Sequence, residues 1–151
     1  MLTRNILTSA ALLVGCAGLM LAPQDSEGAW LGSKQDDRYT LTYDAGSTKA
    51  GATGNGTVVV TPKGVWHLNR EFPTSLSLTP SEGVTVTKPK LKLADAKKFD
   101  EHKGLEFSFP YEAKSAGKHK IDVKLKFAIC IETSCSPVTE TFSLAIDVSK
   151  S

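Results

Sequence analysis

The feature that most constrains the fold is a strict two-residue alternation in the last third of the sequence. From residue 118 to residue 129, the even positions up to 126 are charged and the odd positions from 121 onward are apolar. A period of two sends alternate side chains to opposite faces of a β-strand, so this segment predicts a strand with one buried and one solvated face. The apolar set is Ile121, Val123, Leu125, Phe127 and Ile129, and the charged set is Lys118, Lys120, Asp122, Lys124 and Lys126.

A second alternating segment follows almost at once. Its apolar residues lie at even positions, and its odd positions carry threonine and serine: the apolar set is Val138, Phe142, Leu144, Ile146 and Val148. The connection between the two segments contains Cys130, Cys135 and Pro137. Two amphipathic strands joined by so short a connection predict an antiparallel hairpin with one cysteine on each limb.

Short β-like runs occupy most of the sequence before this hairpin. They are separated by clusters of glycine, proline, asparagine and serine, and they fall at 39–43, 56–61, 65–68, 75–78, 84–86 and 105–109. The one helix-like stretch, 91–102, is short and poorly amphipathic. Many short strands at this spacing are typical of a β-sandwich or barrel, and about 110 residues suffice for a two-sheet core.

Residues 1–22 have the pattern of an export signal. Arg4 supplies a positive charge, and an apolar run from Ile6 to about Ala22 follows it. Threonine, serine and glycine interrupt this run, which is short for a bilayer-spanning helix of about 20 apolar residues. We therefore expect a protein that works outside the cytoplasm, in the periplasm or cell envelope.

Two cleavage sites compete in this signal. Leu13-Val14-Gly15-Cys16 resembles a bacterial lipobox, in which Cys16 is lipidated and becomes the first residue. The apolar run continues past Cys16, so a conventional cut near Ala22 or Gly28, which discards Cys16, stays open. A membrane contact is expected only through such a lipid anchor.

The remaining sequence divides into a tether and a domain. Residues 23–37 are small and polar and are predicted to be a flexible tether, and 38–151 form the folded domain. The chain carries 18 basic and 16 acidic residues, a formal charge of +2, which is too small an excess to predict nucleic-acid binding. A hydrophobic share of 40% and a charged share of 23% are ordinary for a soluble domain.

Cys130 and Cys135 are predicted to face each other across the hairpin. In a non-hydrogen-bonded register their Cα atoms lie about 4.5 Å apart, a separation that a disulfide tolerates. Cys130 continues the lysine face of its strand, and Cys135 is opposite in phase to Val138. Without a bulge, both sulfur atoms therefore point away from the main core.

Three roles for this pair stay open. A structural disulfide is the default in an exported protein, although closing so short a loop contributes only about 2 kcal/mol in the chain-entropy estimate. An accessible pair at a hairpin tip fits thiol–disulfide exchange. A closed zinc site needs four ligands, whereas His67, His102 and His119 lie in three separate segments, so neither a metal nor a cofactor is predicted.

Two blocks of sequence carry a family resemblance. One is the hairpin from Gly117 to Val148, with its two cysteines and Pro137, and the other is upstream. The upstream block is Thr61-Pro62-Lys63-Gly64-Val65-Trp66-His67-Leu68-Asn69, followed by Phe72-Pro73 and Leu76. In this order, the blocks resemble the family of N-terminal periplasmic domains of the thiol:disulfide interchange protein DsbD, over roughly Tyr39 to Val148.

The resemblance implies a fold and a redox role. The fold is an immunoglobulin-like antiparallel β-sandwich, and Cys130 and Cys135 are its catalytic residues, cycling between dithiol and disulfide. Electrons come from a membrane-embedded reductase and pass to periplasmic thioredoxin-fold proteins. The family shields its cysteine pair with an aromatic and acidic cap, for which Lys97–Lys103 is the candidate segment here, and Trp66 is a candidate aromatic neighbour.

The chain departs from the family pattern in two ways. Four residues separate the two cysteines, where the better-known family member has five. The transmembrane and thioredoxin-like parts of DsbD are absent from this sequence, so the electron donor is expected to be a separate protein.

The sequence thus predicts a monomeric module of the cell envelope, with a lipid anchor at Cys16 as one option. Its expected function is thiol–disulfide exchange through Cys130 and Cys135, which would make it a thiol:disulfide oxidoreductase. Its expected partners are proteins with thiols or disulfides, not nucleic acids. The alternative is a non-enzymatic immunoglobulin-like binding or scaffold domain, in which the same disulfide is structural.

Overall fold

The two cysteine-bearing strands form the hairpin that the alternation predicts. The structure, a computed structural model, describes residues 31–151, so the predicted export signal and Cys16 lie outside the described residues. Strands β11 (Gly117–Ile131) and β12 (Ser134–Ser149) pair antiparallel along the whole of β11, in a continuous register. The five odd-numbered apolar residues of β11 from Ile121 to Ile129 are all buried, as predicted.

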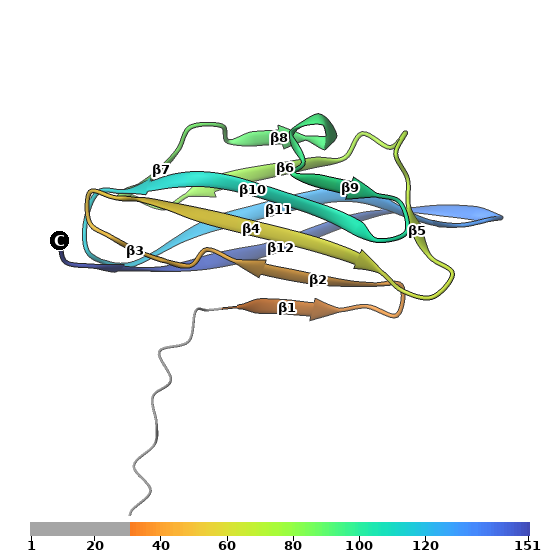
Figure 1. Cartoon of the computed structure of the whole chain (residues 1–151), viewed down its shortest axis with the longest axis horizontal. Helices are drawn as coiled ribbons and strands as arrows, with labels where there is room; N and C mark the ends of the chain where they lie inside the picture. Colours follow the sequence, from red (N-terminus) through yellow and green to blue (C-terminus); the bar gives the residue numbers. More distant parts are fainter. Residues whose placement is uncertain (1–30) are drawn as a thin grey trace, which may run out of the picture.

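Two six-stranded sheets pack face to face and include this hairpin (Figure 1). The first sheet has the order β1-β2-β4-β10-β7, with β9 also on β10, and the second has the order β3-β12-β11-β6-β8, with β5 also on β11. The first sheet contains β1 (Gly32–Gln35), β2 (Tyr39–Asp44), β4 (Thr53–Pro62), β7 (Val84–Val86), β9 (Lys98–Asp100) and β10 (Gly104–Ala113). Besides the hairpin, the second contains β3 (Ser47–Lys49), β5 (His67–Leu68), β6 (Ser75–Pro80) and β8 (Lys90–Lys92).

The structure confirms the predicted all-β, immunoglobulin-like antiparallel β-sandwich. Every strand pairing among the described residues is antiparallel except that of β12 with β3. The helix-like stretch 91–102 contains the end of strand β8, a 3-10 turn at Leu93–Asp95 and strand β9. Within residues 31–151, no helix has the length and apolar character that crossing a membrane requires.

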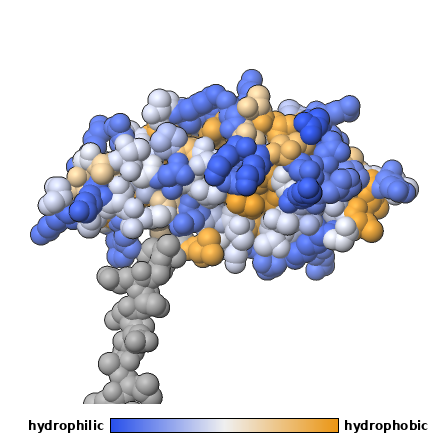
Figure 2. Space-filling model, in the orientation of Figure 1, coloured by the Kyte–Doolittle hydropathy of each residue, from blue (hydrophilic) through white to orange (hydrophobic). Residues whose placement is uncertain are grey.

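Aromatic side chains from both sheets fill the space between them. Three alternate residues of β10 are buried: Phe107, Phe109 and Tyr111. Tyr39 of β2 meets Phe127 of β11 edge to face, with ring centroids 5.0 Å apart. The face visible in Figure 2 is mostly hydrophilic, with a few small hydrophobic areas. Few large hydrophobic side chains among residues 31–151 are exposed, so the apolar surface is largely used in the core, as a sandwich requires.

Strand β1 corrects the predicted flexible tether within the residues that the structure describes, whereas 23–30 lie outside them. The sequence predicted a tether over 23–37 because these residues are small and polar, yet residues 32–35 pair with β2 at the edge of the first sheet. An edge strand outside the core needs no apolar alternation, so its pattern resembles that of a linker. Gly32 lies opposite Tyr43 and leaves the space into which the Tyr43 ring extends.

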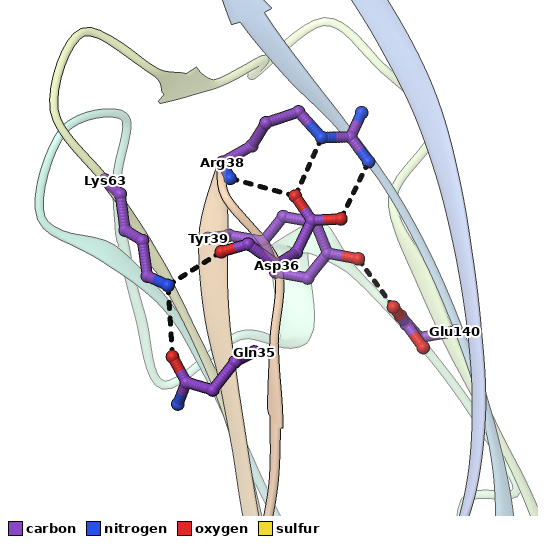
Figure 3. A network of polar contacts seen from close by, with 6 residues as sticks. All are labelled: Gln35, Asp36, Arg38, Tyr39, Lys63 and Glu140. Atoms are coloured by element: carbon purple, nitrogen blue, oxygen red, sulfur yellow. Dashed lines mark hydrogen bonds and ion pairs between the residues drawn. The ribbon is translucent and has the colours of Figure 1, made fainter.

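A polar bridge, formed by Lys34, Tyr39 and Glu140, joins the two sheets. The Tyr39 hydroxyl donates to Glu140 Oε1 at 2.5 Å (Figure 3). Lys34 Nζ donates to Glu140 Oε2 and to the carbonyl oxygen of Thr141, both at 2.8 Å. Every polar group of the bridge thus has a partner across the sandwich.

Burial and hydrogen bonding set the protonation states of the bridge. Burial raises the pKa of Tyr39, and the hydrogen bond to Glu140 raises it further. Burial also opposes ionisation of Glu140, but the bonds from Lys34 and Tyr39 outweigh it and hold the pKa of Glu140 below its usual value. The bridge is therefore a neutral phenol and an ammonium group that share one carboxylate.

A second set of contacts fixes the turn that leads into the bridge. Arg38 Nε donates to Asp36 Oδ1 at 2.9 Å, and this bond holds the pKa of Asp36 below its usual value (Figure 3). Lys63 Nζ donates to Gln35 Oε1 at 3.0 Å and to the carbonyl oxygen of Asp36 at 2.7 Å. These contacts tie the β1–β2 turn to the end of β4.

Candidate functional site

The two cysteines face each other at the tip of the β11–β12 hairpin. Cys130 is directly opposite Cys135 in the register, and a disulfide joins them. Their Cα atoms lie 4.1 Å apart, close to the separation of a non-hydrogen-bonded pair in an antiparallel ladder. Glu132 and Thr133 form the turn beyond them. The predicted pairing across the hairpin is therefore confirmed.

The two sulfur-bearing residues differ sharply in exposure. Cys130 is only 1% exposed, whereas Cys135 lies in the exposed class. The hairpin tip extends beyond the ends of the neighbouring strands, at the right of Figure 1. An incoming thiol therefore meets the Cys135 side of the disulfide, since thiol–disulfide exchange requires access to the sulfur under attack.

Strand β5 explains why Cys130 is buried although it lies on the lysine face. Cys130 is outside the core cluster between the sheets, as its phase predicted. However, β5 pairs with β11 at this point, with His67 opposite Cys130. The backbone N–H of Asn69 then donates to the carbonyl oxygen of Ala128 at 3.1 Å. This segment shields Cys130, whereas in the described part of the chain no second strand pairs with β12 at Cys135.

A shallow groove of about 360 Å³ runs beside the disulfide. Both cysteines line it, together with residues 67–71, Glu101, Ile131 and Glu132. Segments that are far apart in the sequence thus meet around one disulfide. The groove has room for a few side chains of a partner protein, but it is too open to enclose a small molecule.

Asn69 makes the one side-chain hydrogen bond to the disulfide among the described residues. Its Nδ2 lies 3.6 Å from Cys135 Sγ. Its Oδ1 accepts the backbone N–H groups of Glu71 at 2.7 Å and Phe72 at 3.3 Å. The side-chain amide is therefore held at its oxygen end and presents its N–H donors to the sulfur.

One histidine lies beside the cysteines, and a second histidine contacts it. His67 lines the groove, and the ring of His102 lies 5.5 Å from the ring of His67, measured between centroids. His119 is elsewhere, with its ring nitrogens near the carbonyl oxygens of Glu82 and Ser115. Across residues 31–151, no three histidine, cysteine or acidic side chains are grouped so that they could hold a metal ion.

Charged residues form the rim of the groove. Arg70 Nε lies 3.6 Å from Glu101 Oε1, and the Arg70 guanidinium lies 4.7 Å from the centroid of the Phe99 ring. Of the candidate cap segment 97–103, Glu101 reaches the groove, while strand β9 holds the preceding residues on β10. Trp66 packs partly buried against the core and lies outside the groove lining.

A larger hollow of about 460 Å³ lies on the second sheet but lacks the features of a reactive site. Residues of β6, β11 and β12 line it, and half of them carry hydroxyl groups. Its one carboxylate, Asp122, already accepts from Ser143 Oγ and from Lys120 Nζ, and these bonds lower its pKa. The hollow contains no cysteine and no histidine that could activate its serines.

Sequence reasoning gave no role to two residues of the groove, Asn69 and Arg70, whereas Glu101 belongs to the candidate cap segment. Asn69 belongs to the upstream block that resembles the DsbD family, so its position in the sequence was a usable signal. Nothing in the local pattern placed that block beside the cysteines. The contact depends on the pairing of β5 with β11, which joins residues about 60 positions apart.

Comparisons with known proteins find distant likenesses in structure. No protein-family model matches the chain, and no curated protein matches its sequence. The GAE domain of GGA2p from Saccharomyces cerevisiae is 11% identical, with a TM-score of 0.48, and the match covers 78% of this chain and 97% of that domain. The yeast GGA1 GAE domain is 13% identical, with a TM-score of 0.47, over 76% and 97% of the two chains.

A bacterial periplasmic domain is similar at the same distant level. The N-terminal periplasmic domain of ScsB from Proteus mirabilis is 14% identical, with a TM-score of 0.43. The match covers 77% of this chain and 50% of that one. These distant likenesses concern the β-sandwich and say nothing about the chemistry of the disulfide.

Proposed function

We propose that this chain is a thiol–disulfide exchange module of the cell envelope that works through Cys130 and Cys135. The observation that carries the proposal is the asymmetry of the disulfide. Cys135 is exposed at a protruding hairpin tip, and Cys130 is 1% exposed behind β5. An exchange module needs one sulfur that partners can reach and one that only the module itself can use.

The exchange proceeds through a mixed disulfide on Cys135. A partner thiol loses its proton, and its thiolate attacks Cys135 Sγ. The bond between the two cysteines breaks, and Cys130 takes the electron pair and then a proton. A second thiolate of the partner attacks the mixed disulfide and expels the Cys135 thiolate. The partner dithiol is thereby oxidised to a disulfide, two electrons reach this chain, and the reverse sequence passes them on.

A purely structural role fits this position less well. Every residue of β11 already pairs with β12, so the hairpin is closed by its own hydrogen bonds. A disulfide that closes so short a loop contributes about 2 kcal/mol in the chain-entropy estimate, against nearly 5 for a loop of 100 residues. The core lies between the sheets, and neither cysteine belongs to it.

The location and the partners form part of the same proposal. The sequence of residues 1–22 supports export, and Cys16 in the lipobox-like motif supports a lipid anchor. The resemblance to the DsbD family supports a separate membrane-embedded reductase as electron donor and thioredoxin-fold proteins as acceptors. A monomer suffices for this chemistry, because both cysteines come from one hairpin.

The reduction potential of the Cys130–Cys135 pair tests the proposal. The mature protein is equilibrated in graded glutathione buffers, and free thiols are trapped and counted by mass. We expect a potential of about −200 to −250 mV, with the same circular dichroism in both redox states. A potential below about −300 mV, or unfolding on reduction, would make the disulfide structural and favour the binding or scaffold domain.

A further inference from the structure

We propose that Asn69 is a positioning residue that stabilises the thiolate form of Cys135; this inference rests on the proposed exchange function. Asn69 follows β5 directly and lies in the groove beside the disulfide. Its role is to hold an N–H donor on the sulfur that partners reach.

Three hydrogen bonds fix the orientation of Asn69. Its backbone N–H donates to the carbonyl oxygen of Ala128 at 3.1 Å, which attaches it to β11. Its Oδ1 accepts from the backbone N–H groups of Glu71 and Phe72 at 2.7 and 3.3 Å. Only the oxygen of an amide can accept two N–H groups, so the Nδ2 end must face away from them. That end lies 3.6 Å from Cys135 Sγ.

The contact favours one redox and protonation state over the others. A disulfide sulfur and a thiol sulfur are weak acceptors, so the amide gains little from them. A thiolate carries a full charge, and hydrogen bonds to a charged group are roughly twice as strong as neutral ones. A donor that contacts the charged form lowers the pKa of the group. Asn69 therefore stabilises the reduced, ionised state of Cys135 most.

The other charged groups of the groove do not supply this effect. The carboxylates of Glu71, after β5, and Glu132, in the hairpin turn, oppose a negative charge on the sulfur. Arg70 is held by Glu101 at the rim, so its charge is partly balanced there. His67 of β5 also lines the groove, but none of these side chains makes a hydrogen bond to sulfur among the described residues.

Stabilising this thiolate assists exchange in both directions. In the reduced chain, a larger thiolate fraction at Cys135 provides more of the attacking species. When the mixed disulfide is resolved by the partner, Cys135 is the leaving group, and a leaving thiol with a lower pKa departs faster. A neutral amide achieves this without adding a charge that would also attract anions to the groove.

Two substitutions separate the donor from the turn that holds it. Asn69→Ser keeps a hydroxyl that can accept the Glu71 N–H but is too short to reach the sulfur. Asn69→Asp keeps the acceptor oxygen and replaces the N–H donors with a second carboxylate oxygen. Asn55→Asp is the matched control, because Asn55 is exposed on β4 and its Nδ2 donates to Ser108 at 2.8 Å, far from the groove.

The measurement is the pH dependence of Cys135 alkylation in the reduced protein, with the modified residue identified by mass. Thiolate absorbance in the Cys130→Ser background provides a second reading from an isolated thiol. We expect Asn69→Ser to raise the apparent pKa of Cys135 by about one unit, a tenfold loss of thiolate at a fixed pH below that pKa. Asn69→Asp should raise it further, and Asn55→Asp should leave it unchanged.

The two proposals fail in different ways. If both Asn69 variants keep the native circular dichroism and the Cys135 titration stays within a few tenths of a unit of the parent's, the role of Asn69 is overturned. If the titration shifts as expected while the parent disulfide resists reduction by glutathione, the exchange function is overturned and the contact with Asn69 stands. A shift of equal size in Asn55→Asp would assign the effect to net charge and overturn the role of the amide.

Discussion

Strand β12 contributes to two sites that are built in opposite ways. At the polar bridge, Glu140 is held by Lys34 and Tyr39, and each polar group has a partner from the other sheet. At the hairpin tip, Cys135 of the same strand is exposed, and among residues 31–151 its Sγ receives one side-chain hydrogen bond, from Asn69. The bridge joins the two sheets, whereas the disulfide joins two strands that already pair.

This difference separates a site that fixes the structure from one that can change its state. Opening the bridge leaves a buried phenol and a partly buried carboxylate without partners, which costs stability. We expect the β11–β12 register and the core to stay intact when the disulfide opens, because every residue of β11 pairs with β12 and neither cysteine belongs to the core cluster. The proposed exchange function requires the second arrangement at the end of the domain that reacts.

Removing one cysteine at a time should give the largest effect and expose the asymmetry of the disulfide. Cys130→Ser leaves the exposed Cys135, which should form a stable adduct with oxidised glutathione because no second thiol resolves it. Cys135→Ser leaves a buried thiol, because Cys130 is the remaining cysteine. Its rate of adduct formation should be at least about tenfold lower, since exchange needs access to sulfur. The adducts are measured by mass after equal incubation times.

Stability provides the control for this comparison. Both variants lose the same short-loop disulfide, so both should lose about 2 kcal/mol of unfolding free energy by the chain-entropy estimate. Urea denaturation monitored by circular dichroism measures this loss. Equal adduct formation by two folded variants would contradict the assignment of Cys135 as the sulfur that exchanges.

The sequence was sufficient to predict the hairpin, and the reason is local. The alternation from 118 to 129 fixes which residues of β11 face the core, and a short connection fixes the register. These two facts place Cys130 and Cys135 opposite each other on neighbouring strands. They also place both side chains on the faces that point away from the core. No long-range information is needed for either conclusion.

The same reasoning could not predict what surrounds the cysteines. The burial of Cys130 depends on β5, a strand of two residues that is too short to show any periodicity. Asn69 reaches Cys135 only because that strand pairs with β11. Strand β1 was missed for a related reason, since its stability comes from pairing at an edge and from the contact of Lys34 with Glu140, not from an apolar pattern.

Neutralising the bridge carboxylate should give the second-largest effect, on stability alone. Glu140→Gln keeps an acceptor for Tyr39 but loses the charge that pairs with Lys34, which is expected to cost about 1 to 2 kcal/mol at neutral pH. The pKa of Glu140 is lower in the folded state than its usual value. Its contribution is therefore complete above the unfolded pKa, near 4.5, and is lost as the pH falls through the folded value.

Urea denaturation of the two proteins at several pH values checks this expectation. The stability difference between the parent and Glu140→Gln should be largest at neutral pH and should shrink in acid, while the reduction potential of the cysteine pair stays unchanged. Asp122→Asn is the matched control, because Asp122 has a similar pair of donors but is 48% exposed, and its effect should stay within about 0.5 kcal/mol. A changed potential in Glu140→Gln would show that the two sites are coupled.

Removing a charge from the rim of the groove should give the smallest effect. The shift that it causes in the Cys135 titration is the reference against which the effect of Asn69 is compared. Arg70 and Glu101 form a pair whose side chains are 63% and 42% exposed, and such pairs contribute about 0 to 1 kcal/mol. Arg70→Gln should therefore shift the Cys135 titration by less than about 0.3 units, a twofold change in thiolate, and the shift should vanish at high salt. The effect of Asn69→Ser should persist at high salt, because it depends on a direct hydrogen bond to sulfur. A larger shift in Arg70→Gln than in Asn69→Ser would assign the reactivity of Cys135 to rim charge instead of to the amide.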